Sequence, residues 1–334
     1  MGIKGLNSFL RNKFSAGYIK KAFLKGLDGK RIAIDMNNLI AVFYSVSKRN
    51  VCKYTNLMKG PPSDEKIIKS SISYVVSRIN TIIAHGIIPI CCFDGKMSSD
   101  KKHAWAKRKK TNNTAKERLD NANEVLQSVD PFDQTTKMHD NYRKYFYQYF
   151  DRSLMREIVG KIKNVLKKMD IVALTPDSVT APTVNPEAEA LCAHLCINGL
   201  CYAAYSTDTD LHAYGVNICI TKIEENEERE WITIFSESAA ILKIIDMKYE
   251  NFVDFCIMCG TDYNPNIPRV GPVTSYGLIK KYHTIEKVGE CTSNDISILD
   301  HTVARKKFQS ARVPATLMVM ELLKRNVKIT QSEQ

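Results

Sequence analysis

The sequence lacks any apolar stretch long enough to cross a membrane. A membrane-spanning helix needs about 18 consecutive apolar residues, and no run in these 334 residues approaches that length. The N-terminus, MGIKGLNSFLRNK, also lacks the apolar centre and small-residue cleavage site of a secretory signal. A myristoylation pattern is not favoured, since Leu6 stands where that pattern requires Ser or Thr. We therefore expect an intracellular protein without a membrane segment.

Cysteine pairs at zinc-site spacing are scarce. The chain has 10 cysteines, most of them within apolar stretches such as PICCFDG and EALCAHLCINGLCY. Free thiols in such surroundings act as small hydrophobic side chains. The CxxC pair of Cys256 and Cys259 lies in a helical apolar pattern and has no second pair at zinc-site spacing. The sequence thus predicts reduced cysteines in the core and does not favour a zinc site.

Acidic residues are outnumbered by basic ones. The chain has 48 Lys and Arg against 36 Asp and Glu, a formal net charge of +12, and 44% of its residues are hydrophobic. This length and composition suffice for one large α/β domain or two smaller ones. The excess of positive charge favours a polyanionic partner such as nucleic acid, although a basic surface without such a partner is an equally good interpretation of charge alone.

Short apolar runs followed by helical patterns indicate a largely parallel sheet. Runs at 31–45, 85–95 and 199–210 each read as a buried strand that ends in acidic residues. Helical patterns at 64–84, 156–169 and 186–198 alternate with them, which is typical of an α/β fold. Residues 216–235 predict a hairpin at the edge of the sheet. In such sheets, ligands bind in the crevice beyond the carboxyl ends of the strands.

Two segments depart from this alternation. Residues 96–118 hold nine Lys or Arg against two acids and read as a solvated insert, which becomes helical and aromatic up to about residue 150. A basic surface helix and a mobile arm are both consistent with this pattern. Residues 266–282 place a Pro/Gly turn between two helical patterns, which fits either a phosphate- or ion-binding helix–turn–helix or an ordinary helical hairpin.

Seven acidic residues fall at the ends of predicted elements. Any one of them could simply cap a helix, but several lie in apolar surroundings, where a bare carboxylate is costly to desolvate. Hard divalent cations prefer oxygen ligands, and two such ions can activate water and stabilise the leaving oxygen of a phosphodiester. The sequence therefore predicts phosphodiester hydrolysis at a two-metal site. The seven acids are Asp35, Asp94, Glu187, Glu189, Asp208, Asp210 and Asp262.

Six ordered blocks resemble the flap endonuclease family of structure-specific 5′-nucleases, which includes exonucleases and Holliday-junction resolvases of the same fold. The match covers roughly residues 1–120 and 170–290. The blocks are MGIKGL, IDMNNLI, FDGK, PEAEA, STDTDLHAYG and NFVDFCIMCGTDYNPNIPRVGPVTSYGLIKKY. The resemblance implies a PIN-like α/β fold, a central and largely parallel (mixed) sheet flanked by helices, with a helical arch and a helix–two-turn–helix. Because the chain resembles a short, divergent member of this family, we expect a viral or lineage-specific nuclease.

The resemblance also implies a role for each acid. One Mg²⁺ would be held by Asp35, Asp94, Glu187 and Glu189. A second Mg²⁺, sharing Glu189, would be held by Asp208, Asp210 and Asp262. Mn²⁺ would be able to replace either ion.

Further site residues follow from the same resemblance. Lys101 and Arg108 match a basic pair at the base of the arch that contacts the scissile phosphate, and seven residues apart on one helix they would share a face. Gly2 matches a residue that packs beside the metal site. The remaining candidates for nucleic-acid contact are Lys107, Lys109, Lys110, Arg269 and Gly271, the last two in a turn that is expected to bind duplex DNA and a monovalent cation through backbone carbonyls.

The expected domain organisation is one nuclease domain over 1–290, with the arch at 96–150 and the helix–two-turn–helix at 252–285. A C-terminal helical extension and frayed tail would follow at 291–334. The chain departs from the family at Arg269, which replaces a glycine of the turn, and at Ala41, which replaces a base-stacking Tyr. It carries no recognisable sliding-clamp motif.

The expected partner is branched DNA (flap, gapped or nicked) in replication, repair or recombination, in the nucleus or in the cytoplasm of a host cell. Two alternatives stay open. An endoribonuclease would use the same metal site on messenger RNA, because nothing in the carboxylates distinguishes ribose from deoxyribose. A non-catalytic adaptor that binds nucleic acid would be expected to have lost some of the acids, and all seven are present.

Overall fold

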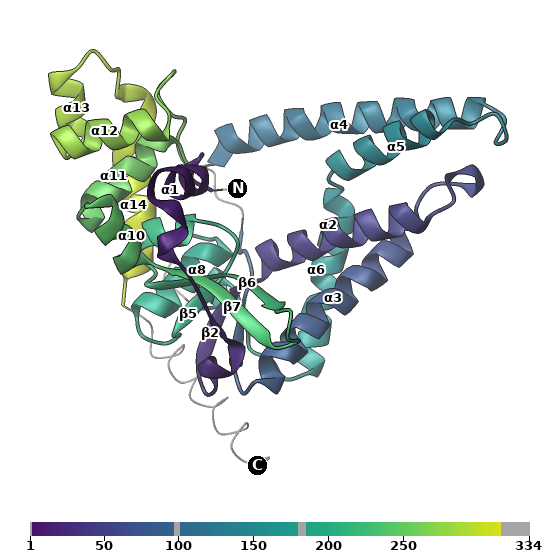
Figure 1. Cartoon of the computed structure of the whole chain (residues 1–334), viewed down its shortest axis with the longest axis horizontal. Helices are drawn as coiled ribbons and strands as arrows, with labels where there is room; N and C mark the ends of the chain where they lie inside the picture. Colours follow the sequence, from purple (N-terminus) through teal and green to yellow (C-terminus); the bar gives the residue numbers. More distant parts are fainter. Residues whose placement is uncertain (1, 97–100, 180–184, 315–334) are drawn as a thin grey trace. The chain divides into compact units, whose positions relative to one another are not determined.

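The computed structural model describes residues 2–96, 101–179 and 185–314. These residues divide into two compact units. The first comprises residues up to 38, 81–101 and the chain from 170 onward, and the second comprises 39–80 and 102–169. Two of the four boundaries fall within continuous helices, α2 (Met36–Tyr54) and α3 (Asp64–Ala84) (Figure 1).

The first unit is built on a mixed sheet of seven strands in the order β1-β7-β6-β5-β2-β3-β4. The pairs from β6 through β4 are parallel, and β1/β7 and β7/β6 are antiparallel. This confirms the prediction of a largely parallel sheet. The strands are β1 (Ile19–Phe23), β2 (Arg31–Asp35), β3 (Ile88–Cys92), β4 (Ala173–Leu174), β5 (Ala203–Tyr205), β6 (Ile218–Glu225) and β7 (Trp231–Glu237).

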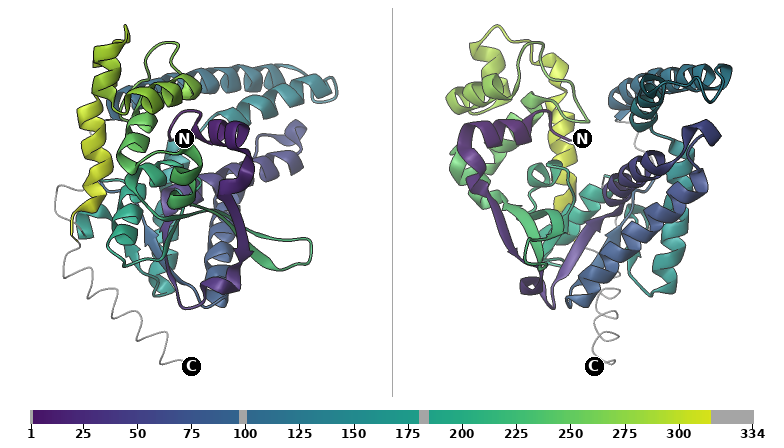
Figure 2. Two further views of the ribbon diagram at one scale, coloured as in Figure 1. Left: turned by 60° about the vertical axis from the view of Figure 1, so that its left-hand side comes forward. Right: turned by 45° about the vertical axis from the view of Figure 1, so that its right-hand side comes forward.

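The predicted hairpin of β6 and β7 is present, but its expected place at the sheet edge is wrong. β1 pairs with β7 along its whole length and forms the edge instead (Figure 2). Four of the five residues of β1 are exposed, so the strand has no buried alternation that sequence analysis could detect. Its pairing with a strand some 210 residues away fixes its position.

Helix α8 (Ala188–Ile197) lies at the centre of the first unit and packs against β2, β3 and β5. Most of its residues are buried all round, and small side chains at Ala188, Ala190 and Ala193 allow the close approach. The other helices of this unit are α1 (Leu6–Phe14), α7 (Pro176–Val179), α9 (Asp210–Tyr214), α10 (Ser238–Ile245), α11 (Tyr249–Cys259), α12 (Pro272–Tyr282), α13 (Ile285–Cys291) and α14 (His301–Gln309).

Cys256 and Cys259 are buried in α11 as free thiols, as predicted for core cysteines. Helices α11 and α12 and the loop between them occupy the region in which a helix–two-turn–helix is expected. Of the predicted extension and tail at 291–334, the part from residue 315 onward lies outside the described residues.

The second unit is helical. Helix α6 (Arg152–Lys168) begins where the Asp151 carboxylate accepts bonds from the amides of Ser153 and Leu154, at 2.8 and 3.0 Å. Its buried residues recur at every fourth position, which is the pattern of one helical face: Leu154, Ile158, Ile162 and Leu166.

Helix α4 (Lys102–Ser128) packs antiparallel on α5 (Thr136–Gln148). The expectation that the basic insert becomes helical only in its later part is wrong, because α4 is continuous from Lys102. The apolar seam of α4, Ala115, Ala122 and Leu126, lies in its second half. Its first half is rich in Lys and Arg, which favour helix without any apolar pattern.

No helix among the described residues is both long enough and apolar enough to span a membrane.

Candidate metal centre

The strand ends of the first unit bring acidic side chains together, as sequence analysis predicted. Asp35 is the last residue of β2 and is only 6% exposed. Its Oδ1 accepts a bond from the Asn38 amide at 3.0 Å, and its Oδ2 accepts one from Ser206 Oγ at 3.0 Å. Burial, and next the charge of Asp94, raise the pKa of Asp35 to about 7. This carboxylate is therefore short of positive charge.

Asp94 follows the end of β3. Its amide donates to Asn37 Oδ1 at 3.1 Å, and its own Oδ1 accepts a bond from the amide of Ala188 at 2.9 Å. Ala188 is the first residue of α8, so Asp94 lies at the N-terminus of that helix, where the unpaired amides favour negative charge.

Glu187 and Glu189 are presented by the same helix end. Glu187 is the residue before α8, and Glu189 lies in its first turn, so both can face one site. Glu189 is only 8% exposed. Burial, and next the charges of Asp210 and Asp208, raise its pKa well above the ordinary value.

Asp208 and Asp210 follow β5, and Asp210 is the first residue of α9. The segment is not extended through both residues, because the helix begins between them. Each nevertheless offers an oxygen to a cluster with Glu189 in which all three ligand atoms lie within 4.8 Å of one another. Asp210 Oδ1 accepts a bond from the Ile3 amide at 2.7 Å.

The other oxygen of Asp210 points most clearly to a cation site. Oδ2 is fully buried and has no hydrogen-bond partner among the described residues. Burial, and next the charge of Asp208, raise the pKa of Asp210 well above its ordinary value. A buried acceptor without a donor is costly unless a cation binds it.

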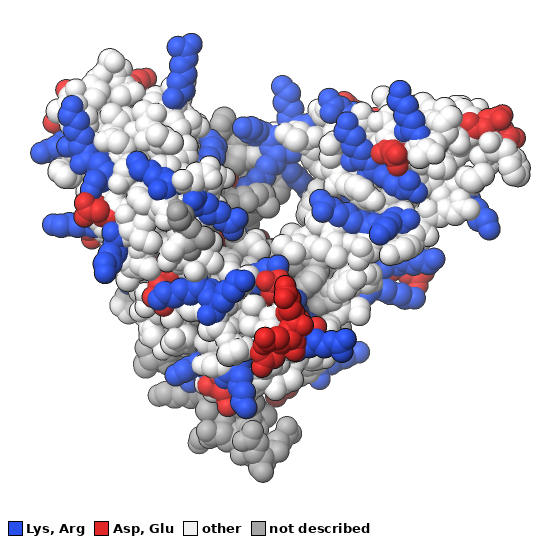
Figure 3. Space-filling model, in the orientation of Figure 1, with Lys and Arg blue, Asp and Glu red and all other residues white. Residues whose placement is uncertain are grey.

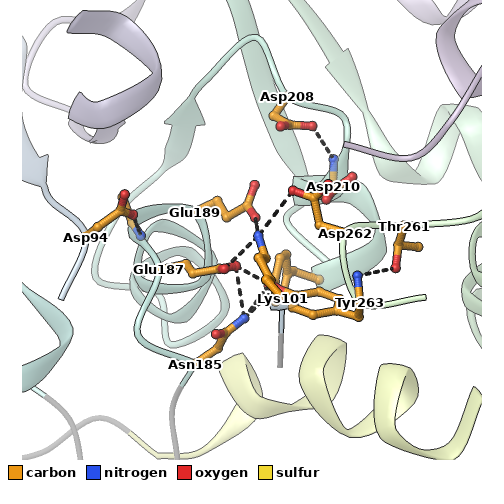
Figure 4. A network of polar contacts seen from close by, with 12 residues as sticks. Asp94, Lys101, Asn185, Glu187, Glu189, Asp208, Asp210, Thr261, Asp262 and Tyr263 are labelled. Carbon is orange, nitrogen blue, oxygen red and sulfur yellow. Dashed lines mark hydrogen bonds and ion pairs between the residues drawn. The ribbon is translucent and has the colours of Figure 1, made fainter. Parts of the chain in front are cut away.

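Lys101 supplies one positive charge to the acids (Figure 4). Its Nζ lies 2.6 Å from Glu187, 3.3 Å from Asp262 and 3.7 Å from Glu189. Burial alone would lower the pKa of Lys101, but the charges of Glu189, Glu187 and Asp262 outweigh it and raise the pKa above the usual value. One ammonium cannot neutralise Glu187, Glu189, Asp208, Asp210 and Asp262 together.

The donor set fits a hard divalent cation. It consists of carboxylate oxygens, the ligand type that Mg²⁺ and Mn²⁺ prefer, and it includes a buried oxygen without a donor. Glu189, Asp208 and Asp210 would hold such an ion. Asp35 and Asp94 lie near enough for the charge of Asp94 to raise the pKa of Asp35.

Gly2 lies against the same carboxylates, as predicted. A Cβ atom built at this position would lie 1.8 Å from Asp208 Oδ1 and 2.7 Å from Asp210 Oδ1. Its φ of +95° also disfavours any other residue. Glycine is therefore required at this position both by space and by backbone conformation.

The basic candidates of α4 belong to the second unit. Arg108 is half-buried, whereas Lys107, Lys109 and Lys110 are exposed. The idea that Lys101 and Arg108 project from one helix needs correction, because α4 begins at Lys102 and Lys101 precedes it. On the face of the molecule drawn in Figure 3, Lys and Arg side chains lie over α4. The same view shows a group of acidic side chains near the turn between β6 and β7.

The turn before α12 has an unexpected conformation. Arg269, exposed, has a φ of +65°, a left-handed conformation that glycine adopts without strain. Gly271 has a φ of −100° and needs no such freedom. The side chain of Asn266 donates to the carbonyls of Ile267 and Val270, both at 3.1 Å, which fixes the turn.

Sequence analysis missed the neutral residues around the acids. Asn185 and Tyr263 bond to Glu187, and Tyr214 bonds to both of them. Asn185 directly precedes PEAEA and Tyr263 directly follows Asp262, while Tyr214 lies within STDTDLHAYG. These positions are the sequence signal that could have pointed to them. Asn38 and Ser206, whose amide and hydroxyl donate to Asp35, were missed as well.

The sequence is similar to that of known nucleases. The sequence matches the XPG N-terminal domain over residues 1–115 and the XPG I-region over residues 177–262. Flap endonuclease 1 of Vanderwaltozyma polyspora is 30% identical over 298 residues, which are 89% of this chain and 71% of that protein. The probable RAD2-like endonuclease 369L of Invertebrate iridescent virus 6 is 29% identical, over 92% of this chain and 79% of that protein.

Some relatives are much longer than this chain. The chain spans 57%, 64% and 51% of the flap endonucleases 1 of Theileria parva, Cryptosporidium parvum and Theileria annulata, at 26%, 29% and 26% identity.

Solved structures share the fold. The catalytic core of Rad2 in complex with DNA substrate superposes with a TM-score of 0.57 at 18% identity, over 98% of this chain and 80% of that one. Flap endonuclease-1 from Methanococcus jannaschii superposes with a TM-score of 0.52 at 17% identity, over 89% of this chain and 84% of that one. The sheet with acids at its carboxyl edge thus defines the PIN-like fold of these nucleases. The chain belongs to the flap endonuclease, or XPG-type, family.

Proposed function

We propose that this protein is a Mg²⁺-dependent, structure-specific 5′-nuclease that hydrolyses phosphodiester bonds in branched DNA. The observation that carries the proposal is the meeting of Glu189, Asp208 and Asp210, with their ligand oxygens within 4.8 Å, next to a buried Asp210 oxygen that has no donor. Family membership supports the reaction class, and the Rad2 complexes support DNA as the partner of that relative.

The cofactor in this proposal is a pair of Mg²⁺ ions, which Mn²⁺ can replace. Asp35, Asp94, Glu187 and Glu189 would hold one, and Asp208, Asp210 and Asp262, sharing Glu189, the other. Bound metal ions would supply a water of lowered pKa and charge stabilisation for the leaving oxygen. A monovalent cation at the turn of 266–271 remains part of the proposal.

The protein's own groups would act around these ions. Lys101, which is within 4 Å of three of the acids, would turn its ammonium toward the scissile phosphate when DNA arrives. Arg108 would join it, and this role rests on the family resemblance. Lys107, Lys109, Lys110, Arg269 and Gly271 would contact the phosphate backbone, which gives affinity without sequence preference.

The domain division expected from the sequence also remains a proposal. It assigns a nuclease domain to 1–290, an arch to 96–150, a helix–two-turn–helix to 252–285 and an extension to 291–334. An intracellular location, in the nucleus or in the cytoplasm of a host cell, is proposed on the same grounds as the DNA substrate.

A substrate panel tests the proposal. Purified protein is incubated with end-labelled 5′-flap, nicked, gapped and linear DNA and with matched single-stranded RNA, in Mg²⁺ or in EDTA. We expect cleavage in Mg²⁺ near the branch point of the flap, and none in EDTA. Preferential cleavage of RNA would favour the endoribonuclease alternative, and binding without cleavage of any substrate would favour the adaptor.

A further inference from the structure

The two oxygens of Glu187 have different kinds of partner. Oε1 lies 2.6 Å from the ammonium of Lys101. Oε2 accepts hydrogen bonds from Tyr263 Oη at 2.6 Å and from Asn185 Nδ2 at 3.2 Å (Figure 4). One oxygen thus faces the cationic side of the site, and the other is held by neutral donors.

These neutral donors form a closed network with a third residue. Tyr214 Oη lies 2.5 Å from Tyr263 Oη, and Asn185 Nδ2 lies 2.9 and 2.5 Å from the two hydroxyls. Asn185 is 2% exposed, Tyr214 0% and Tyr263 9%. Because Tyr263 donates its proton to Glu187, its oxygen must accept from Tyr214 or Asn185. The hydrogen bonds therefore run toward the carboxylate.

Packing holds the two tyrosine rings in place. Both rest edge-on against Phe308 of α14, with centroids 5.1 Å away for Tyr214 and 5.7 Å for Tyr263. The amide of Tyr263 donates to Thr261 Oγ1 at 3.0 Å, which fixes the loop that also carries Asp262. The surrounding fold therefore fixes the positions of both tyrosine side chains.

We propose that Asn185, Tyr214 and Tyr263 are positioning residues that hold Glu187 in the orientation needed for a divalent cation. The proposal rests on the proposed function, since it assigns these residues to the same metal centre. Because the donors are neutral, they fix Oε2 and leave the negative charge of Glu187 to be balanced by a cation at Oε1. Groups that orient a metal ligand in this way typically contribute about 10–100-fold in metal affinity.

The experiment measures Mn²⁺ binding in the absence of DNA, from the electron paramagnetic resonance signal of the free ion. The variants are Tyr263→Phe and Asn185→Ala, with Tyr214→Phe as a milder change should either fail to fold. Tyr276→Phe is the matched control, because its half-buried hydroxyl donates to the Ile245 carbonyl at 3.2 Å and, among the described residues, bonds to none of the acids. Circular dichroism verifies that each variant is folded.

We expect Tyr263→Phe and Asn185→Ala to weaken Mn²⁺ binding by about 10–100-fold, with the control unchanged. In a Glu187→Gln background, Tyr263→Phe should cause little further loss, because the group that it orients is already altered. Single-turnover cleavage should slow while flap-DNA affinity stays within about twofold of the wild type, since the phosphate contacts are untouched.

Two contrary results are distinguishable. Wild-type affinity for Mn²⁺ in both folded variants would overturn the positioning role and leave the proposed nuclease intact. Failure of the wild-type protein itself to bind Mn²⁺ would overturn the metal centre, and the positioning role with it.

Discussion

The position that a Cβ atom would take on Gly2 lies 1.8 Å from Oδ1 of Asp208. Any other residue at position 2 must therefore displace that carboxylate or the N-terminal backbone. We predict that Gly2→Ala slows single-turnover cleavage of a 5′-flap by about a hundredfold, the usual cost of a displacement of about 1 Å at a reacting centre. The control is Gly17→Ala, where a Cβ atom meets nothing within 4 Å. A Gly2→Ala variant as active as Gly17→Ala would contradict the close packing.

We also predict that removing one of the buried acidic charges stabilises the fold when no metal ion is bound. Without metal ions, the charge of Asp210 is buried beside that of Asp208, so it opposes folding. In EDTA, Asp210→Asn should raise the free energy of unfolding by on the order of 1 kcal/mol, the equivalent of one pKa unit. Mg²⁺ should stabilise the wild type more than this variant, because a ligand is lost.

Asp254 is the matched control for that experiment. It is equally buried, but its carboxylate bonds to the Arg305 guanidinium at 2.6 Å through both oxygens and to the Ile285 amide at 3.1 Å. Asp254→Asn should therefore destabilise the protein by about 3 kcal/mol, with or without Mg²⁺. Thermal unfolding in EDTA and in Mg²⁺ measures both effects. If the two variants shifted stability in the same direction in EDTA, the acids around Asp210 would be structural.

Arg269 provides a test of the proposed duplex contact. A left-handed conformation costs a residue with a side chain about 1–2 kcal/mol relative to glycine, so Arg269→Gly should stabilise the fold. If Arg269 contacts phosphate, the same change should weaken DNA binding and make it less dependent on salt. Arg229 in the β6–β7 turn has a similar φ of 61°, and Arg229→Gly should stabilise without weakening DNA binding. Equal DNA affinities for the two variants would remove Arg269 from the interface.

We predict different effects on catalysis and on binding for two pairs of basic residues at the start of the arch. The double variant Lys101→Ala, Arg108→Ala should slow single-turnover cleavage by about a hundredfold or more, roughly 3 kcal/mol of barrier, because these cations would act on the transition state. The variant Lys109→Ala, Lys110→Ala should mainly weaken binding, since both side chains are exposed. Rates are compared at saturating protein. Equal slowing by both pairs would make this stretch a generic basic surface.

Sequence reasoning located the acids well, because each lies at the end of an element with a local pattern. Asp35 ends a buried run and Glu187 precedes an apolar helix, and both patterns can be read over about ten residues. The edge strand β1 could not be found in this way, since its exposed residues are placed only by pairing with β7.

The bonds around Glu187 are equally non-local. Tyr263 meets Glu187 across 76 positions, and Tyr214 meets Tyr263 across 49. A buried hydroxyl has no periodic signature, and its partner is determined only when α9 and the loop after α11 pack together. The positive φ of Arg269 likewise opposes its local preference and is imposed by the turn that Asn266 holds.

The most direct test of the central claim is the single-turnover rate of Asp208→Ala and Asp94→Ala on a 5′-flap substrate in Mg²⁺, measured together with affinity for the same DNA. If the acids form a two-metal hydrolytic centre, each change should abolish cleavage and leave DNA binding largely intact, because both ions depend on a shared set of carboxylates. Cleavage that remains within a few fold of the wild-type rate in either variant would contradict the assignment of the metal centre.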